Sequence, residues 1–345
     1  MNSKIGLLLV NLGTPESPSP KDVGVYLREF LMDPLVIDIP AFYRFLLVNF
    51  LIVPFRSRSS ASLYQKVWTD RGSPLLFHSQ DLTEKVSQEV GEHATTRLAM
   101  RYGNPSIREG LEAFHREGIR RVVVFPLYPQ YSLAATESSV QKVRSVAKAE
   151  GWQFDFEFVP PFYIEKAFID AFEEVGRPFI DKGFDKVLFS FHGLPERQVK
   201  KTDPSGQYCL EQKSCCEKIV SENVLCYRAH CYATARELAR RFSLSDRDYV
   251  IGFQSRLGRT PWIQPYSDKF YETLPAEGVK RLLVFSPSFV ADCLETLEEI
   301  AIRGNEQFRE NGGEKIELVP SLNSEDIWVK AVVQLASKAL GEPLS

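Results

Sequence analysis

Two stretches of this 345-residue chain repeat one another at an offset of 160 residues, and this repeat constrains the fold more than any other feature. Glu117–Arg121 leads into the apolar run VVVFPLYPQYS, and Glu277–Arg281 leads into LLVFSPSFVAD. An early apolar run ends in LGTP, and the run that begins at Lys186 ends in HGLP. Matching strand-and-turn units at two pairs of positions predict two similar domains.

Short runs rich in Val, Ile, Leu and Phe alternate with helical patterns along both halves. Near-continuous apolar runs are typical of strands buried on both faces, so we predict an α/β fold with parallel sheets flanked by helices. The expected strands include Lys4–Asn11, Arg121–Pro126, Asp155–Pro160, Lys186–His192, Asp248–Gln254 and Arg281–Ser286, and a further strand end is expected at Arg101. The expected helices are Asp22–Leu31, Leu82–Val90, Ile107–Glu117, Thr136–Ala149, His230–Phe242, Cys293–Arg303 and Glu325–Leu340. We expect domains at 1–160 and 161–320, with residues 321–345 forming a helix that packs back on them.

Composition narrows the class of protein. The chain is 44% apolar and 25% charged, with a formal net charge of −3, which is typical of a globular protein and gives no field that attracts nucleic acid. The residues before the first apolar run lack the pattern of a signal peptide. We therefore expect a cytoplasmic protein with no nucleic-acid partner.

Residues 41–55, AFYRFLLVNFLIVPF, are the most apolar in the chain. A transmembrane helix needs about 20 predominantly apolar residues. This segment is shorter and is interrupted by Arg44 and Asn49, so it does not predict a membrane span. Two interpretations remain: a buried core helix, or an exposed apolar lip that touches a bilayer or an apolar ligand.

Candidate catalytic residues follow two of the predicted strands, in the region where α/β sheets bind ligands. His192 ends one strand, and Asp292, Glu295 and Glu299 follow another at the helical spacing i, i+3 and i+7. An imidazole facing carboxylates suits a divalent metal or a proton relay. The alternatives are a structural histidine and a helix-capping box formed by Asp292 and Glu295.

Aromatic and basic residues stand at other predicted strand ends. They are Arg101, Tyr102, Tyr128, Tyr131 and Trp262. Arginine binds carboxylates with a bidentate fork, and aromatic faces stack on flat rings. Each residue alone is typical of a core or a helix cap. Together they suit a cleft for a flat apolar ligand that carries carboxylates.

Five of the six cysteines lie close together, at Cys209, Cys215, Cys216, Cys226 and Cys231. In a cytoplasmic protein such a group indicates a metal site rather than disulfides. Ligand type alone does not distinguish a four-cysteine zinc site from an iron–sulfur cluster. Thiols with only a packing role are the third interpretation.

The motifs resemble those of the ferrochelatases, enzymes that insert ferrous iron into a porphyrin to make haem. The matching segments occur in the family's order and at its spacing: LLLVNLGTPESP, YLREFLMDP, VWTDRGSPLL, MRYGNPSI, FPLYPQYS, FSFHGLPER, GFQSRLGRTPW and SPSFVADCLETLEEI. The resemblance covers nearly the whole chain. It implies a chelatase-like fold of two similar Rossmann-like domains around a porphyrin cleft.

The resemblance also implies roles for individual residues. His192 matches the family's catalytic histidine, which takes pyrrole protons or ligates the incoming iron, and Glu295 matches the carboxylate opposite it. Both are therefore expected to contact the substrate Fe²⁺. The positions that match porphyrin-binding residues are Arg101, Tyr102, Tyr131 and Trp262. The segment 41–55 matches a lip through which protoporphyrin enters from a membrane.

The cysteine-rich segment looks like that of bacterial ferrochelatases with an internal [2Fe–2S] cluster. Four thiolates are the usual ligand set. We expect Cys209, Cys226, Cys231 and one of the pair Cys215–Cys216 to be the ligands. One departure stands out: Cys293 occupies a position where many relatives have histidine, and it is left without a role.

The expected substrates are protoporphyrin IX and Fe²⁺, and the expected product is protohaem. The resemblance further suggests peripheral contact with the inner face of the cell membrane and with the oxidase that precedes this step in haem synthesis. The alternatives are a coproporphyrin ferrochelatase, a cobalt or nickel chelatase that acts on another tetrapyrrole, and a haem-binding carrier.

Overall fold

A computed structural model describes residues 4–258 and 260–344. The chain forms two compact units. Unit 1 comprises Met1–Tyr128, Leu133–Pro160 and Asn323–Ser345, and unit 2 comprises Pro129–Ser132 and Pro161–Leu322. The main division falls at residue 160. The structure adds that the C-terminal segment belongs to unit 1 and that a four-residue loop belongs to unit 2.

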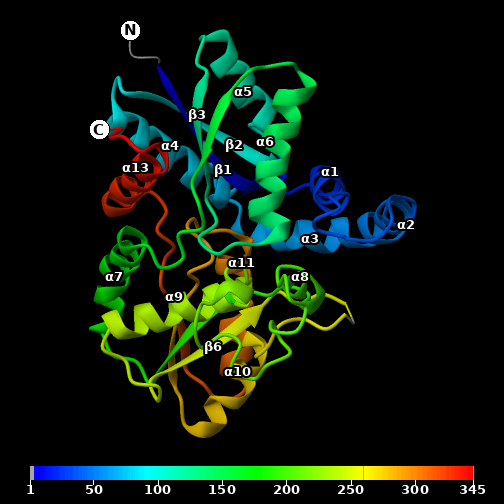
Figure 1. The fold of residues 1–345 in the computed structure, drawn as a ribbon. Coiled ribbons are helices and arrows are strands. Elements are labelled where there is room, and N and C mark those ends of the chain that lie inside the picture. Colours follow the sequence, from blue (N-terminus) through cyan, green and yellow to red (C-terminus); the bar gives the residue numbers. More distant parts are fainter. Residues whose placement is uncertain (1–3, 259, 345) are drawn as a thin grey trace. The chain divides into compact units, whose positions relative to one another are not determined.

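The sheet of unit 1 has four parallel strands in the order β2-β1-β3-β4 (Figure 1). They are β1 (Ile5–Gly13), β2 (Ala94–Tyr102), β3 (Arg121–Pro126) and β4 (Asp155–Phe158). The residues Leu7 to Val10 of β1 are fully buried on both faces, as a central parallel strand requires. Strand β2 has the end that the sequence predicts at Arg101 and Tyr102, but the sequence does not predict its start, because Thr95, Thr96 and Arg97 interrupt the apolar pattern.

The sheet of unit 2 also has four parallel strands, in the order β6-β5-β7-β8. They are β5 (Lys186–His192), β6 (Tyr249–Gln254), β7 (Arg281–Phe285) and β8 (Lys315–Leu318). In both sheets the first strand pairs with the second and the third, and the third pairs with the fourth. The two units therefore share one topology, which confirms the predicted pair of similar α/β units.

Helices flank both sheets. Those of unit 1 are α1 (Pro20–Leu31), α2 (Ala41–Leu46), α3 (Val53–Val67), α4 (Pro74–Val90), α5 (Ile107–Arg116), α6 (Ser138–Ala149) and α13 (Asp326–Leu340), with π-helical η1 (Leu47–Ile52) and η2 (Leu133–Glu137). Those of unit 2 are α7 (Lys166–Ile180), α8 (Glu196–Lys200), α9 (Tyr227–Arg241), α10 (Ser267–Thr273), α11 (Leu294–Thr296) and α12 (Asn305–Glu310), with 3₁₀ turns η3 (Ser221–Asn223) and η4 (Pro275–Glu277) and π-helical η5 (Leu297–Gly304). Local sequence sets some of the starts: Ser106 and Glu109 form a reciprocal capping box at α5.

Each unit has its own hydrophobic core. In unit 1, Leu8 and Val122 of the sheet pack with Phe114 of α5. In unit 2, Leu188 and Val284 of the sheet belong to a second cluster. All five side chains are fully buried, so each sheet has the covered face that a parallel sheet needs.

The C-terminal helix α13 packs on unit 1. Trp328 is fully buried there. Lys85 of α4 donates to the Ser324 carbonyl oxygen at 2.8 Å and pairs with Asp326 at 2.7 Å. Arg121 of β3 donates to the carbonyl oxygen of Leu340, the last residue of α13, at 3.0 Å. Both ends of α13 are therefore fixed to elements from the first half of the chain.

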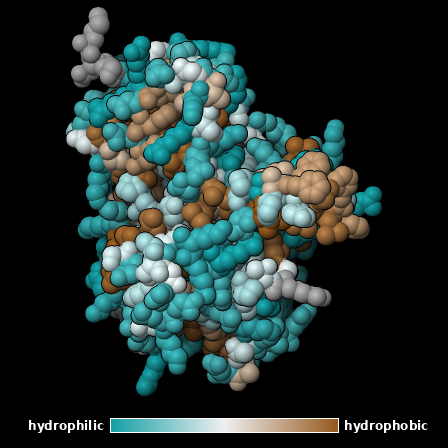
Figure 2. Space-filling model, turned by 45° about the vertical axis from the view of Figure 1, so that its right-hand side comes forward, coloured by the Kyte–Doolittle hydropathy of each residue, from teal (hydrophilic) through white to brown (hydrophobic). Residues whose placement is uncertain are grey.

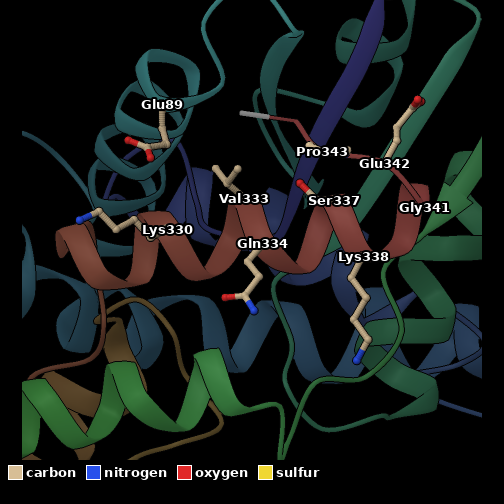
Figure 3. Close-up of a pocket in the computed structure, with 9 residues that line it drawn as sticks. All are labelled: Glu89, Lys330, Val333, Gln334, Ser337, Lys338, Gly341, Glu342 and Pro343. Atoms are coloured by element: carbon tan, nitrogen blue, oxygen red, sulfur yellow. The ribbon is translucent and has the colours of Figure 1, made fainter.

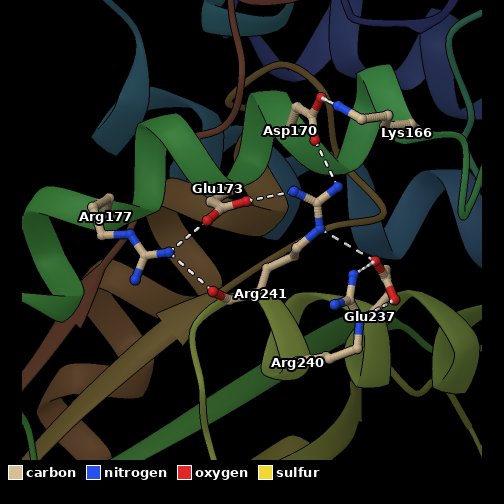
Figure 4. A network of polar contacts seen from close by, with 7 residues as sticks. All are labelled: Lys166, Asp170, Glu173, Arg177, Glu237, Arg240 and Arg241. Carbon is tan, nitrogen blue, oxygen red and sulfur yellow. Dashed lines mark hydrogen bonds and ion pairs between the residues drawn. The ribbon is translucent and has the colours of Figure 1, made fainter.

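An ion-pair network joins α7 and α9 in unit 2 (Figure 4). Arg241, the last residue of α9, pairs with Asp170 at 2.7 Å and with Glu173 at 2.8 Å, both on α7. Its own helix supplies Glu237, and Arg177 of α7 donates to the Arg241 carbonyl oxygen at 2.9 Å. The end of α9 is thus held against α7 by several charged contacts at once.

Candidate active site

His192 is the last residue of β5, and its side chain is half-buried. Its Nδ1 lies 2.6 Å from the Gly193 carbonyl oxygen. Because a carbonyl only accepts, Nδ1 carries the proton and Nε2 carries the lone pair. The His192 backbone is fixed as well: its N–H donates to Ser288 Oγ at 3.2 Å, and its carbonyl accepts from the Tyr227 hydroxyl at 2.8 Å. The ring therefore offers a nitrogen that can accept a proton or bind a metal.

The turn after His192 needs a glycine. The Gly193 N–H donates to the Gln254 carbonyl oxygen at 2.8 Å, so the ends of β5 and β6 lie in contact. A Cβ atom at Gly193 would lie 2.7 Å from that oxygen and 3.2 Å from a ring carbon of Trp262. The ring centroids of Trp262 and Phe289 lie 6.5 and 6.2 Å from that of His192. The imidazole thus stands beside two aromatic side chains.

The loop after β7 brings acidic residues to the same edge of the sheet, because β5 and β7 are parallel neighbours. Helix α11 begins after Cys293, whose backbone N–H donates to Thr296 Oγ1 at 3.1 Å, and it continues as the π-helix η5. The cap therefore joins Cys293 to Thr296, one residue later than a capping box of Asp292 and Glu295 would lie. The Glu295 side chain is half-buried.

The other carboxylates of the predicted acidic stripe have structural partners. Glu299 accepts hydrogen bonds from the backbone N–H of Ser255, at 2.8 Å, and from the Ser255 hydroxyl. Asp292 is buried and accepts from the Thr296 hydroxyl at 2.9 Å. Glu299 therefore fixes the end of β6, and Asp292 fixes the start of α11. For Glu295 the catalytic role stays a prediction.

Cys293 lies next to this carboxylate. Burial raises the pKa of the Cys293 thiol well above its usual value, and the charge of Glu295 raises it further. A thiol that stays protonated at neutral pH is a weak hydrogen-bond donor and a poor metal ligand. The structure thus makes Cys293 a neutral neighbour of Glu295.

Tyr131 lies on the loop Pro129–Ser132, which is bound to unit 2. Gln130 Nε2 donates to Thr234 Oγ1 of α9 at 3.1 Å. The backbone N–H of Tyr131 donates to His230 Nδ1, also on α9, at 3.2 Å. These bonds explain why the loop belongs to unit 2, although the residues before and after it belong to unit 1. Tyr131 belongs to the same unit as His192.

Arg101 and Tyr102 end strand β2 in unit 1. The Arg101 guanidinium forms an ion pair with Asp33, and its Nε donates to Ser138 Oγ at 2.7 Å. The Tyr102 ring is fully buried 4.3 Å from the guanidinium carbon, and its hydroxyl donates to Asp33 at 2.9 Å. Burial raises the pKa of Tyr102, so the hydroxyl keeps its proton. Asp33, Ser138 and Tyr102 together fix the orientation of Arg101.

The five cysteines of residues 209–231 are all buried as free thiols. The Sγ atoms of Cys215 and Cys216 lie 3.7 Å apart. Cys226 contacts both Cys209 and Cys216, and hydrogen bonding to Cys226 together with burial raises the pKa of Cys216. In the part of the chain that the structure describes, no group of three or more His, Cys, Asp or Glu side chains is arranged to hold a metal ion.

Two buried polar side chains order the backbone of this cysteine segment. Asp203 accepts hydrogen bonds from the backbone N–H groups of Tyr208 and Cys209 at 2.8 and 2.9 Å. Asn223 donates to the Cys215 carbonyl oxygen at 2.7 Å. The segment is therefore a defined structure in which Cys209 and Cys215 have fixed positions.

The apolar segment 41–55 forms α2, η1 and the start of α3, and much of it is exposed. The exposed fractions are 67% for Phe42, 66% for Phe50 and 73% for Phe55. Figure 2 shows apolar surface gathered over these helices. The segment is therefore an exposed lip and not a buried core helix. Among residues 4–258 and 260–344, no helix is both long and apolar enough to cross a bilayer.

A cavity of about 590 Å³ opens in unit 1 between α4 and α13 (Figure 3). Its walls include Glu89 of α4 and Lys330 and Lys338 of α13. None of the site residues predicted from the sequence lines it. This cavity is therefore distinct from the candidate active site.

Several residues that hold the site have no signal in the sequence. Asp33 lies within the motif YLREFLMDP, but nothing in the motif reveals that its carboxylate fixes Arg101. Tyr227, which binds the His192 carbonyl, begins a helix far along the chain. Ser255 adopts the left-handed conformation (φ 66°), which no rule predicts for serine. Such partners are found only once the chain is folded.

Comparison with known proteins identifies the family. A family model described as Ferrochelatase matches residues 4–340. The chain belongs to the ferrochelatase family. The ferrochelatase of Coxiella burnetii strain Dugway 5J108-111 is 44% identical over 340 residues, which cover 98% of this chain and 95% of that protein. The ferrochelatase of Azotobacter vinelandii is 46% identical over 330 residues, which cover 95% and 97%. As a ferrochelatase, the protein is an enzyme that inserts iron into a porphyrin, the haem-forming step.

Solved structures agree with the ferrochelatase fold. SirB from Bacillus subtilis with Fe³⁺ superposes with a TM-score of 0.52 at 12% sequence identity, covering 98% of both chains. The sirohydrochlorin chelatase SirB in complex with cobalt gives a TM-score of 0.54 at 10% identity, covering 97% of this chain and 95% of that one. At these identities the likeness shows the fold alone, and it confirms the predicted chelatase-like α/β architecture.

Proposed function

We propose that this enzyme inserts Fe²⁺ into protoporphyrin IX, with His192 acting on the ring and Glu295 on the metal. The main support is the lone pair on His192 Nε2, which the Gly193 carbonyl fixes by holding the proton on Nδ1. Glu295 follows the neighbouring strand at the same edge of the sheet. A base and a carboxylate at one sheet edge are the two groups that porphyrin metallation needs.

The chemistry of insertion assigns each group a task. Two pyrrole protons must leave the ring before it binds a divalent cation. His192 Nε2 accepts one pyrrole proton, releases it to solvent and then accepts the second, and the Glu295 carboxylate attracts the cation and replaces part of its water shell. Trp262 and Phe289, beside His192, offer aromatic faces that suit contact with a macrocycle.

Porphyrin binding involves Arg101, Tyr131 and Trp262 in this proposal. The Arg101 fork suits a propionate carboxylate, and 12% of its side chain remains exposed. Tyr102 has no exposed surface. Tyr102 therefore acts indirectly: its hydrogen bond to Asp33 helps to orient Arg101.

The apolar lip favours protoporphyrin over coproporphyrin and favours delivery from a membrane. Coproporphyrin carries four carboxylates and protoporphyrin two, and burying an unpaired carboxylate is costly. Phe42, Phe50 and Phe55 form a surface that suits the acyl region at the inner face of the cell membrane.

In this proposal a [2Fe–2S] cluster is held by Cys209, Cys216, Cys226 and Cys231, and their thiols would move into a ligand set as the cluster binds, because the described thiols are not arranged around a metal ion. Its thiols are buried together, and Cys226 contacts both Cys209 and Cys216. Cys216 is preferred over Cys215 because Arg228 Nη1 donates to its Sγ at 3.1 Å, and this contact opposes the hydrogen bond to Cys226 and the burial that raise the pKa of the Cys216 thiol. When bound, the cluster would cross-link the segment and would take no part in metal insertion.

The deciding experiment is an anaerobic assay of the purified protein with Fe²⁺ and each of the two porphyrins. We expect protohaem to form with a higher kcat/KM for protoporphyrin IX than for coproporphyrin. A clear preference for coproporphyrin would overturn the assigned substrate. Absence of turnover with either porphyrin would overturn the assigned activity.

A further inference from the structure

His230 is a fully buried histidine outside the groups that act on the porphyrin. It lies on α9, and its ring stacks on Tyr163 with centroids 3.7 Å apart and planes 9° apart. Nδ1 lies 3.2 Å from the backbone nitrogen of Tyr131, and Nε2 lies 2.9 Å from the Val224 carbonyl oxygen. Both ring nitrogens are therefore used, and they bind two different segments of the chain.

The partners fix the tautomer of the ring. The backbone N–H of Tyr131 only donates, so Nδ1 must carry the lone pair. The Val224 carbonyl only accepts, so Nε2 must carry the proton. The two bonds exist together only in this single neutral form, and stacking on Tyr163 fixes the ring plane. His230 is thus a rigid bridge of defined polarity.

The two bridged segments differ in kind. One is the loop Pro129–Ser132, which carries Tyr131. The other contains Val224 and is the part of the cysteine segment before α9, where Asn223 donates to the carbonyl oxygens of Cys215 and Lys218 at 2.7 and 2.8 Å. Val224 directly follows Asn223, so the position of its carbonyl depends on the order of that segment.

We propose that His230 is a positioning residue that fixes the Tyr131 loop against the cysteine segment, so that the order of the segment determines how well the enzyme binds porphyrin. The proposal rests on the proposed porphyrin-binding role of Tyr131. The cysteine segment can then affect porphyrin binding without electron transfer, because His230 on α9 contacts both that segment and the Tyr131 loop.

Two substitutions separate the two bonds of the bridge. In His230→Asn, the amide oxygen lies near the place of Nδ1 and can still accept from Tyr131. In His230→Gln, the longer side chain places an amide N–H near Nε2 and can still donate to Val224. Each variant keeps one hydrogen bond and loses the other, with similar loss of ring stacking. The same two substitutions at His115, an exposed residue of α5, are the matched controls.

Amide hydrogen exchange measures the order of the Tyr131 loop and of the cysteine segment in the absence of porphyrin. We expect faster exchange of a peptide that contains Tyr131 in His230→Gln than in His230→Asn, and the reverse order for peptides from residues 209–226. Equal exchange at both ends in the two variants would overturn the bridge. This result does not depend on catalysis, so it stands even if the proposed activity fails.

Porphyrin affinity reads the functional consequence. By fluorescence titration with protoporphyrin IX, His230→Gln should bind about fivefold more weakly than His230→Asn, the typical effect of one neutral hydrogen bond. Asn223→Ala, which loosens the cysteine segment, should weaken binding in the wild type but not further in His230→Gln. Additive losses from Asn223→Ala and His230→Gln would show that the segment does not act through His230 and would overturn the coupling.

Discussion

A single hydrogen bond decides what the His192 ring can do. The Gly193 carbonyl holds the proton on Nδ1, and this leaves the lone pair on Nε2. We expect His192→Ala to lower kcat for iron insertion by at least about a hundredfold, the usual contribution of a positioned base. Protoporphyrin binding and the melting temperature should change little, because the ring is half-buried.

The control for His192 is His115→Ala, which removes an exposed imidazole in unit 1. It should leave kcat at the wild-type value. Substantial turnover by His192→Ala, at normal porphyrin affinity, would remove His192 from the mechanism.

Loss of Asp33 should destabilise unit 1, because its carboxylate forms a buried ion pair. Its carboxylate is 3% exposed and pairs with Arg101, which is itself 12% exposed. Asp33→Ala leaves that guanidinium buried without its charge partner, so we expect a loss of about 3–5 kcal/mol in the free energy of unfolding. Urea unfolding followed by circular dichroism measures it.

The matched control for Asp33 is Asp81→Ala, which breaks an exposed bidentate pair with Arg71 on the same unit. That pair should contribute about 1 kcal/mol or less. Equal losses in the two variants would mean that Arg101 finds water or another partner when Asp33 is removed.

Single residues also show how far the sequence alone reaches. The ends of strands make His192 and Glu295 candidates because an apolar run followed by a turn marks an edge of a parallel sheet. Glu299 belongs to the same pattern, yet its carboxylate binds Ser255. Spacing reports which residues share a region, whereas the partner of each side chain depends on loops that arrive from elsewhere in the chain.

The stability of the contact between α7 and α9 depends on pH, because ion pairs join the two helices. Hydrogen bonds from Arg240, opposed by burial, and from Arg241 lower the pKa of Glu237. Burial opposes but does not cancel the hydrogen bonds from Lys166 and Arg241, which lower the pKa of Asp170. A carboxyl whose pKa is lower in the folded state than in the unfolded chain stabilises the folded state at pH values above its ordinary pKa, which is 3.8 for Asp170 and 4.5 for Glu237. This stabilisation is lost as the pH falls below those values.

Arg241→Leu tests this dependence. At pH 7 we expect a loss of about 1 kcal/mol, since the pairs are partly exposed. The difference in melting temperature from the wild type should shrink as the pH is lowered below about 4, where the carboxyls are protonated in the unfolded chain. Arg116→Leu, at an exposed pair with Glu112, is the control and should show little effect at any pH. A difference that stays constant down to pH 3 would assign the effect to packing.

In the cysteine segment, the neighbours Cys215 and Cys216 should respond differently to replacement by Ser. Cys216 contacts Cys226 and accepts a bond from Arg228, whereas Cys215 accepts one from the Leu210 N–H. Cys216→Ser should therefore abolish the visible absorbance and acid-labile sulfide of the purified protein, and Cys215→Ser should retain both. Stoichiometric zinc in a colourless wild-type protein would show that the segment holds a different metal.

The helix after β7 shows why element type is harder to predict than element position. The sequence predicts a helix over Cys293–Arg303, and a helix does begin there, but Leu297–Gly304 is π-helical. Apolar periodicity does not distinguish the two forms over so few turns. The hydrogen bonds from Ser255 to Glu299 that accompany this segment come from another strand.

For the whole molecule, the apolar lip predicts where the enzyme works. Replacing Phe50 and Phe55 with Ser removes two large exposed side chains and should weaken binding to anionic lipid vesicles at least tenfold in a sedimentation assay. Activity with protoporphyrin dispersed in detergent should persist. Val25→Ser, at an exposed apolar residue outside residues 41–55, is the control. Equal vesicle binding by all three proteins would show that the lip does not dock on lipid.

The return of α13 to unit 1 has a consequence for synthesis on the ribosome. The chain leaves unit 1 at Pro160 and comes back at Asn323. Chains are synthesised at about 5–20 residues per second, so the surface of α4 and β3 stays uncovered for on the order of ten seconds or longer until α13 has been made. Unit 2, almost entirely continuous in sequence, can close during that interval. The half of the protein that is made first is therefore the half that is finished last.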